Sequence, residues 1–290
     1  MVIIGSARHD ENGKLRGGKS GDQGGEVETE KFYKARAGWR CFRPKEESAA
    51  FLIAQDMQAA CFNDHIGYDQ GNNQSLYNAV KNLHFDCSKL NTDEETDCSQ
   101  LARVCILYAG INIPMFSTAD MPQYLLATGA FMEMTGAGYT LTGKDLKRGD
   151  ILCTKVKGHC AVVLTDGDNV KRAGKLTLTG DWNKTTTARL QQFLNTPIDG
   201  EIWRQNARNK KYLTCAGSGW IFKLANFGAG SPVIRALQKM TGASVDGIAG
   251  RNTALKLQQY LNSRGYYLRL TGIADTLTAA MLQLYLNDQL

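Results

Sequence analysis

The C-terminal part of the 290-residue chain repeats a short pattern, and this repeat limits the possible folds more than any other feature. The runs 187–195, 253–262 and 278–287 each begin with Thr-Ala and end with Leu-Asn. Leu176-Thr177-Leu178-Thr179-Gly180 precedes the first run much as Leu268-Arg269-Leu270-Thr271-Gly272 precedes the last. Self-similarity of this kind is the mark of a repeat architecture. Residues 173–290 are therefore predicted to form a domain of their own.

The positive charge of the chain is concentrated in the same region. From Lys175 onward there are 14 Lys and Arg against 6 Asp and Glu, a net charge of +8; the remainder holds 20 and 22, a net of −2. A basic domain favours polyanions, either nucleic acid or the anionic polymers of a Gram-positive wall. No Lys/Arg run or nucleic-acid motif supports the first partner, so no nucleic-acid partner is expected.

Length and composition bound the rest of the chain. A chain of 290 residues suggests two domains, here residues 1–172 and 173–290. No stretch approaches the roughly 18 apolar residues of a membrane span, and Met1–Gly5 is too short for the apolar part of a signal peptide. We therefore expect synthesis in the cytoplasm without a leader and no membrane partner. The eight cysteines lack a framework spacing and are predicted to be free thiols. No spacing suggests zinc, so no metal or cofactor is expected.

The strongest chemical signal is Cys98, at the start of a predicted helix that Gly110 ends. Leu101, Val104, Cys105 and Tyr108 recur at helical spacing, and Asp97 or Thr96 can cap the N-terminus. The positive end of the helix dipole favours a thiolate at that position. The alternative is that Cys98 is only a small apolar core residue.

A nucleophilic cysteine needs a histidine from elsewhere in the fold, and His159 is the candidate. Residues 146–152 read as a turn feeding a strand, and residues 158–164 read as a second strand that begins near His159. Gly158 leaves room for another group beside it. A hydrogen-bonded surface histidine is the alternative.

These three motifs in this order resemble the NlpC-type papain-like cell-wall peptidases and the related CHAP amidases, over roughly residues 60–170. The motifs are Asp97-Cys98-Ser99, residues 146–151 (Leu-Lys-Arg-Gly-Asp-Ile) and residues 158–164 (Gly-His-Cys-Ala-Val-Val-Leu). The resemblance implies an α+β papain-like fold, with Cys98 as nucleophile and His159 as base. A tyrosine often precedes the nucleophile helix in these enzymes, and Tyr68 fits that place. Asp97 completes the residues predicted to lie beside the substrate.

Two features of the first domain stay open. The residue that orients His159 is unassigned: Asp168 and Asn169 fit chemically but lie in a turn, so a Cys-His dyad is an alternative. The polar, Gly-rich residues 8–26 are either a mobile arm or a loop against the active cleft, as in lysins that start with a similar stretch. In the second case Asp22 and Gln23 contact the substrate, Gln23 as a donor to an oxyanion.

The second domain resembles the peptidoglycan-binding-like repeats of bacterial and phage lysins, an all-α unit. The most specific stretches are 233–238 and 245–253. The first copy differs because it carries Trp182 and Trp203, which either pack differently or are exposed to stack on sugars. Together the resemblances imply a phage or prophage endolysin that cleaves an amide of the peptidoglycan stem, with endopeptidase activity favoured. The alternatives are an N-acetylmuramoyl-L-alanine amidase and a non-catalytic wall-binding protein.

The remaining elements are predicted from local pattern. The sequence predicts a strand over the aromatic run 32–43 ended by Pro44, a helix over 46–61, a turn over 66–71, a helix over 76–83, a loop over 114–122, and a helix and a strand-like piece over 121–134.

Overall fold

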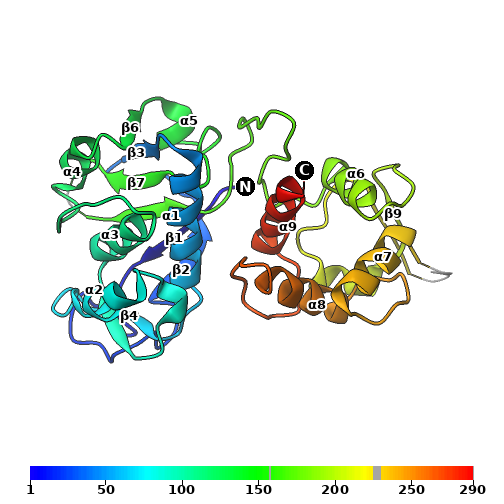
Figure 1. Ribbon diagram of the computed structural model, residues 1–290, viewed down its shortest axis with the longest axis horizontal. Coiled ribbons are helices and arrows are strands. Elements are labelled where there is room, and N and C mark those ends of the chain that lie inside the picture. The colour runs from blue at the N-terminus through cyan, green and yellow to red at the C-terminus, as the bar shows by residue number, and fades with distance from the viewer. Residues whose placement is uncertain (157, 225–229, 290) are drawn as a thin grey trace. The chain divides into compact units, whose positions relative to one another are not determined.

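A computed structural model describes residues 1–156, 158–224 and 230–289 of the chain. The chain divides into two compact units, Met1–Val170 and Lys171–Leu290 (Figure 1). Each unit has its own core, and each is described separately.

The first unit is built on a six-stranded antiparallel sheet in the order β2-β1-β8-β7-β3-β6. Its strands are β1 (Ile3–Ala7), β2 (Val27–Lys31), β3 (Trp39–Pro44), β6 (Phe131–Met134), β7 (Ile151–Thr154) and β8 (Cys160–Val163). The first strand of the chain lies inside this sheet, between β2 and β8. All five residues of β1 are buried, which explains the apolar start of the sequence.

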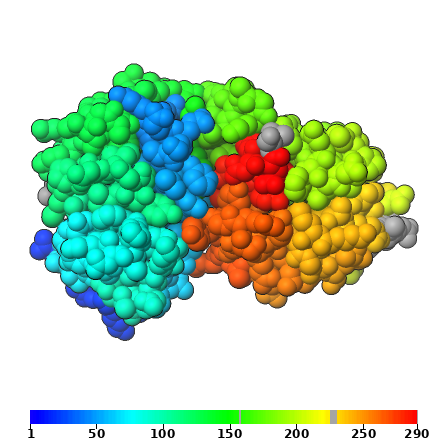
Figure 2. All heavy atoms as spheres, in the orientation of Figure 1, coloured from blue at the N-terminus to red at the C-terminus, as the bar shows by residue number. Residues whose placement is uncertain are grey.

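Helices cover one face of this sheet. Helix α1 (Glu47–Ala60) packs against α3 (Cys98–Tyr108), and both contact β1 and β8. Gly5 allows the close approach of α1, because a Cβ at this position would lie 2.9 Å from Cγ of Met57. Helix α1, in blue, and the cyan segment around α2 (Ser75–Val80) lie on the face of the first unit shown in Figure 2.

A hydrophobic cluster covers the opposite face. Strand and loop residues form this cluster: Val2, Ile4, Ala35, Trp39, Cys41, Leu146, Leu152, Ala161 and Val163. The indole N–H of Trp39 donates to the carbonyl of Tyr33 at 2.7 Å, so the largest ring of the cluster is buried without an unpaired donor.

The smaller elements of this unit include a parallel two-stranded pair, β4 (Ile66–Tyr68) and β5 (Glu94–Thr96). The remaining described elements are η1 (Lys81–Leu83), η2 (Cys87–Lys89), α4 (Met121–Ala127) and α5 (Ala137–Thr140).

Most local predictions for this unit are confirmed, two differ from the structure, and one strand was not predicted. The turn predicted over 66–71 begins instead as strand β4, because pairing with β5 overrides the local Gly-rich signal. The strand over 32–43 starts only at Trp39 and includes Pro44. Strand β2 was missed, since its polar sequence Val-Glu-Thr-Glu-Lys lies at the edge of the sheet, half exposed.

The second unit contains four helices that share one hydrogen-bonding device among its described residues. The helices are α6 (Lys184–Phe193), α7 (Pro232–Thr241), α8 (Arg251–Asn262) and α9 (Thr276–Asp288). Each carries a buried glutamine: Gln191, Gln238, Gln258 and Gln283. In each case the amide oxygen accepts from the backbone N–H of a loop glycine, which is respectively Gly200, Gly247, Gly272 and Gly180.

This device closes the second unit on itself. Gln283 belongs to the last helix, yet it binds the loop at Gly180 that precedes the first helix, at 3.1 Å. Asn287 accepts from the N–H of Leu176 at 2.7 Å and donates to its carbonyl at 2.9 Å. Asn262 makes the same two bonds to Leu268. The contact between the end and the beginning of the unit therefore repeats a contact between neighbouring copies.

The prediction that this domain is all-α is wrong in one respect. Between α6 and α7 the chain forms two parallel strands, β9 (Ile202–Asn206) and β10 (Trp220–Lys223), with η3 (Ala207–Tyr212) between them. The helical pattern of the copies does not extend into this segment.

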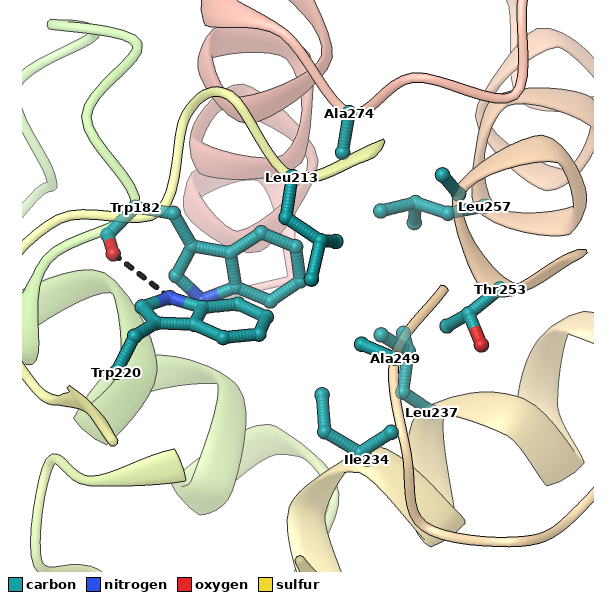
Figure 3. Close-up of a pocket in the computed structure, with 10 residues that line it drawn as sticks. Trp182, Leu213, Trp220, Ile234, Leu237, Ala249, Thr253, Leu257 and Ala274 are labelled. Atoms are coloured by element: carbon teal, nitrogen blue, oxygen red, sulfur yellow. Dashed lines mark hydrogen bonds between the residues drawn. The ribbon is translucent and has the colours of Figure 1, made fainter. Parts of the chain in front are cut away.

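Two tryptophans form the centre of the second unit's core (Figure 3). The rings of Trp182 and Trp220 meet edge to face with centroids 5.2 Å apart, and the Trp220 indole N–H donates to the Trp182 carbonyl at 3.0 Å. With Leu213, Ile234 and Leu257 they line a small cavity of about 10 Å³. Such a space holds about one water molecule and excludes a sugar ring.

Candidate active site

Cys98 occupies the first position of α3, and its surroundings follow from local sequence. Asp97 is the N-cap residue: its Oδ1 accepts from the backbone N–H of Ser99 at 2.8 Å and of Gln100 at 2.9 Å. The Asp97 carboxylate also accepts from the Asn73 side chain. These bonds satisfy N–H groups that a helix start leaves without partners. Cys98 is only 7% exposed. The Asp97 carboxylate serves as the helix cap.

His159 lies immediately before β8, beside the N-terminus of α3. Its backbone N–H donates to Thr154 Oγ1 at 3.0 Å, which ties it to the end of β7. Its ring is tilted against that of Trp39, with centroids 6.1 Å apart. Nε2 is buried and has no hydrogen-bond partner among the described residues. The ring is therefore held by packing and by the β7–β8 turn.

The structure brings Cys98, His159 and Cys160 together. The Cys160 thiol donates to the carbonyl of Cys98 at 3.0 Å. Hydrogen bonding from Cys160 lowers the pKa of Cys98, and burial opposes this effect. The hydrogen bond and positive charge of His159 lower the pKa further, to about 6. Burial and the neighbouring Cys98 sulfur raise the pKa of Cys160 well above its usual value. Of the two sulfurs, Cys98 is the one set up to ionise near neutral pH.

Neighbours on a strand alternate, and Cys160 points towards the helical face of the sheet, where α3 begins. That same direction places its sulfur against Cys98, a contact that the sequence did not reveal.

Tyr68 reaches this site through strand pairing. It is the register partner of Thr96 in the parallel pair β4–β5, and Thr96 stands two residues before Cys98. Its hydroxyl accepts from Gln70 Nε2 at 3.0 Å. Burial, and then the neighbouring Cys98, raise the pKa of Tyr68. Pairing between strands therefore bridges the long sequence gap between Tyr68 and the nucleophile helix.

The Gly-rich segment folds onto the first unit through Gly21 and Asp22. Backbone N–H groups of Gly21 and Asp22 donate to Glu95 Oε1 at 3.1 Å and to the Asp64 carbonyl at 2.8 Å. Asp22 Oδ1 accepts from the N–H groups of Gly24 and Gly25, both at 2.7 Å. The Gln23 amide donates to the carbonyls of Ser20 and Gly21, at 3.0 and 3.3 Å. Both side chains thus hold the loop, and a role in substrate binding stays a proposal.

The two candidates for an orienting residue lie elsewhere. Asp168 is 3.7 Å from the N-terminal amino group of Met1, and Asn169 Nδ2 donates to Asp145 Oδ1 at 2.7 Å. Neither has a contact with His159 among the described interactions. The side chains of this turn therefore bind other parts of the first unit.

Glu30 is the acidic group that the structure adds near His159. It lies on β2, and Arg8 pairs with its Oε2 at 3.2 Å while its Oε1 is buried without a partner among the described residues. Burial raises the pKa of Glu30, and the charges of Arg8 and His159 oppose this. The sequence pattern does not identify Glu30, because it lies some 70 positions before Cys98. Only the pairing of β2 with β1 and of β1 with β8 brings Glu30 towards His159.

Other features bear on cofactors and partners. All eight cysteines are free and buried in the structure. Within residues 1–156, 158–224 and 230–289, no group of three or more His, Cys, Asp or Glu side chains is arranged to hold a metal ion. Over the same residues, no helix has the length and apolar character needed to cross a membrane.

The two tryptophans of the first repeat copy differ in exposure. Trp182 is buried in the core described above, whereas Trp203 on β9 is 45% exposed. Of the two alternatives raised by the sequence, Trp182 therefore follows the packing one and Trp203 the exposed one.

Comparison with known proteins gives one match. No curated protein sequence and no solved structure matches this chain. A family model described as an endolysin-like domain matches residues 4–170, a range that contains Cys98, Cys160 and His159 and ends with the first compact unit. This range is more than half of the chain, and the chain belongs to the endolysin-like domain family.

Proposed function

We propose that the protein is a peptidoglycan hydrolase that cleaves an amide of the stem peptide with Cys98 as nucleophile and His159 as base. Membership of the endolysin-like domain family supports action on the cell wall. The single observation that carries the mechanism is the placement of Cys98 at the capped N-terminus of α3, next to His159, and its lowered pKa agrees with this placement.

The proposed reaction uses groups at this site. His159 holds the proton that Cys98 gives up, and the thiolate attacks the amide carbonyl carbon. The backbone N–H of Cys98, at the helix N-terminus, stabilises the oxyanion that forms. His159 then protonates the leaving amine, and the acyl group stays on the sulfur. Water, deprotonated by His159, releases the acid and restores the thiol.

The test is Cys98→Ala in the full chain, with Cys153→Ala as the matched control. Cys153 is an equally buried thiol on β7 that donates to the Thr118 carbonyl at 3.3 Å and not to Cys98. We expect Cys98→Ala to lower the rate of clearing of a purified peptidoglycan suspension at least about a thousand-fold, with an unchanged melting temperature. Full activity of a well-folded Cys98→Ala protein would exclude the mechanism.

The fragments identify the bond. Mass spectrometry of the released products distinguishes an endopeptidase, which cuts between stem residues, from an amidase, which cuts between sugar and stem peptide. Wild-type protein that binds walls but releases no fragment would favour a non-catalytic wall-binding protein.

We further infer that residues 173–290 bind the cell wall. With this role the protein would be an endolysin of phage or prophage origin, released through a membrane hole made by another protein. The net charge of +8 from Lys175 onward and the repeat pattern support this role. Binding is expected to weaken as salt is raised. Retention of full-length Cys98→Ala protein on purified walls, compared with an unrelated protein of the same charge, measures it. Equal retention would mean charge attraction alone.

A further inference from the structure

The segment between α6 and α7 interrupts the repeat of the second unit. In three loops the residue three positions after the glycine is the N-cap of a helix: Asn183, Gly250 or Asp275. In the loop of Gly200 that position is Trp203, and no helix begins there. The chain turns away at Arg204, which has a left-handed backbone (φ 56°) unusual for a residue other than glycine. Residues 203–211, called the basic insertion below, thus lie outside the repeat.

The basic insertion exposes one kind of charge. Arg204, Arg208, Lys210 and Lys211 are all exposed, and the sequence from Ile202 to Leu224 contains no Asp or Glu. None of these four cations forms an ion pair with a carboxylate in the described part of the chain. By contrast, Lys184 on α6 pairs with Glu201 at 2.8 Å. Lys210 Nζ and Lys211 Nζ each lie 5.0 Å from a ring centroid, of Phe222 and Tyr212 respectively. These ring contacts leave the positive charges without an acidic partner among the described residues.

The exposed indole of Trp203 stands at the start of this charged run. Its Nε1 donates to Asp199 Oδ2 at 3.3 Å, which limits rotation of the ring while leaving 45% of the residue exposed. An exposed, fixed indole offers an apolar face to a flat partner, and sugar rings present such a face through their C–H groups.

Buried polar residues anchor the insertion between its exposed ones. Gln205 is fully buried; it accepts from the N–H of Ala249 at 2.7 Å and donates to the Gly247 carbonyl at 3.0 Å. Asn209 donates to the Ala249 carbonyl at 2.8 Å. The insertion is therefore fastened to the neighbouring repeat loop, and its exposed side chains start from a fixed backbone. A preorganised surface loses less entropy on binding than a mobile one.

We propose that the basic insertion is a binding surface for an anionic sugar polymer of the cell wall, with Trp203 against a sugar ring and the four cations along the phosphate or carboxylate groups. The proposal rests on the proposed wall-binding role of the second unit and assigns that role to one segment of it. The repeat helices then serve as the scaffold that presents the insertion.

The experiment titrates the full-length protein with soluble probes under two salt conditions, about 50 mM and about 200 mM. The probes are glycosylated teichoic acid chains, which carry phosphate, soluble uncrosslinked peptidoglycan strands, which carry carboxylate, and a single-stranded DNA oligonucleotide of matched charge. The test variants are the triple substitution R208Q/K210Q/K211Q and the single substitution W203A. The control is K175Q/K239Q/K256Q, which removes three positive charges from other parts of the same unit.

We expect the triple variant to bind the preferred wall polymer at least about ten-fold more weakly at the lower salt, with the slope of log K against log salt reduced by about 2 to 3. W203A is expected to weaken binding of the sugar polymers several-fold with little change in the slope. The control variant is expected to stay within about two-fold of the wild type.

Three results would overturn the proposal, and a fourth would overturn the wall-binding role on which it rests. Equal losses in the test and control triple variants would mean that net charge, not the insertion, drives binding. DNA bound as tightly as the wall polymers, with no effect of W203A, would mean a general polyanion surface. If the wild type bound neither the soluble polymers nor intact walls, the wall-binding role itself would fail. Binding to walls that is unaffected by the test variants would leave that role standing and reject only the insertion.

Discussion

The chemistry at Cys98 depends on three neighbouring residues. Cys98 lies at a helix start that Asp97 caps, next to His159, and the Cys160 thiol donates to its carbonyl. Burial alone would keep a thiol protonated, as it does for Cys87 and Cys105, whose pKa values burial raises. Cys98 is also buried, yet its pKa is lowered by the neighbouring Cys160 and by the hydrogen bond and charge of His159.

This contrast predicts a pH profile for alkylation of Cys98 by iodoacetamide. The thiolate is the reactive form, so the rate should rise with pH through a midpoint at about 6, well below the usual thiol range. In Cys160→Ala the largest stabilising hydrogen bond is lost, and the midpoint should move upward, towards the ordinary value. Mass spectrometry of the full chain under reducing conditions gives the rate at Cys98.

Cys153→Ala is again the control, since its thiol donates to Thr118 on the neighbouring segment. Its midpoint should match the wild type. An identical midpoint in Cys160→Ala would show that Cys160 only fills space. A lower clearing rate with an unchanged midpoint would point to displacement of the helix start, because Cys160 also binds the Cys98 carbonyl.

At the scale of elements, three of the glutamines hold the loop that follows their own helix, and Gln283 of the last helix holds the loop before the first. Gln258 is 1% exposed; its amide accepts from Gly272 N–H at 3.0 Å and donates to the Ile273 carbonyl at 2.9 Å. Asn262, one turn further along α8, adds two bonds to the backbone of Leu268 at the start of the same loop. The glycine permits the turn by its positive φ of 71°.

Adjacent glutamines on α8 allow a matched test of this device. Gln258→Ala leaves a buried N–H and a buried carbonyl without partners, which should cost about 3 kcal/mol and lower the melting temperature of the second unit by roughly 10 °C. Gln259→Ala, at an exposed position of the same helix, should change stability by less than about 0.5 kcal/mol. Calorimetry of both variants checks this, and similar losses in the two would rule out the hydrogen-bonding role.

At the scale of the whole molecule, the two units have separate cores and the second one is closed by its last helix. Helix α9 supplies Gln283 and Asn287, which bind the loop at Gly180 and the backbone of Leu176. Its apolar residues, including Leu282 and Leu286, are buried. Removing α9 therefore removes one of the four described α-helices of the second unit and both closing contacts.

We predict that a chain shortened to residues 1–275 loses the unfolding transition of the second unit and keeps that of the first. The first unit contains its own sheet and core, so alkylation of Cys98 should keep its midpoint at about 6. Calorimetry and limited proteolysis measure the first outcome, and the alkylation profile measures the second. Cooperative melting of an intact second unit without α9 would contradict the closure.

Sequence by itself determined the features that rest on neighbouring residues. Asp97 caps α3 and Gly110 ends it, because capping and helical periodicity act within a few positions, so Cys98 could be placed at the first turn. The runs that begin with Thr-Ala and end with Leu-Asn likewise predicted α6, α8 and α9 of the second unit.

Only the tertiary structure decided which distant residues meet. The N-terminal strand β1 lies between β2 and β8, a pairing over more than 150 positions that no local pattern encodes. Tyr68 approaches Cys98 through a parallel strand pair, and Cys160 on β8 donates to the Cys98 carbonyl at the start of α3. Asp168 pairs with the N-terminal amino group instead. Strand pairing and burial are set by the free energy of the whole fold. A single residue's local sequence therefore gives its chemistry, while its partners depend on how the sheet is assembled.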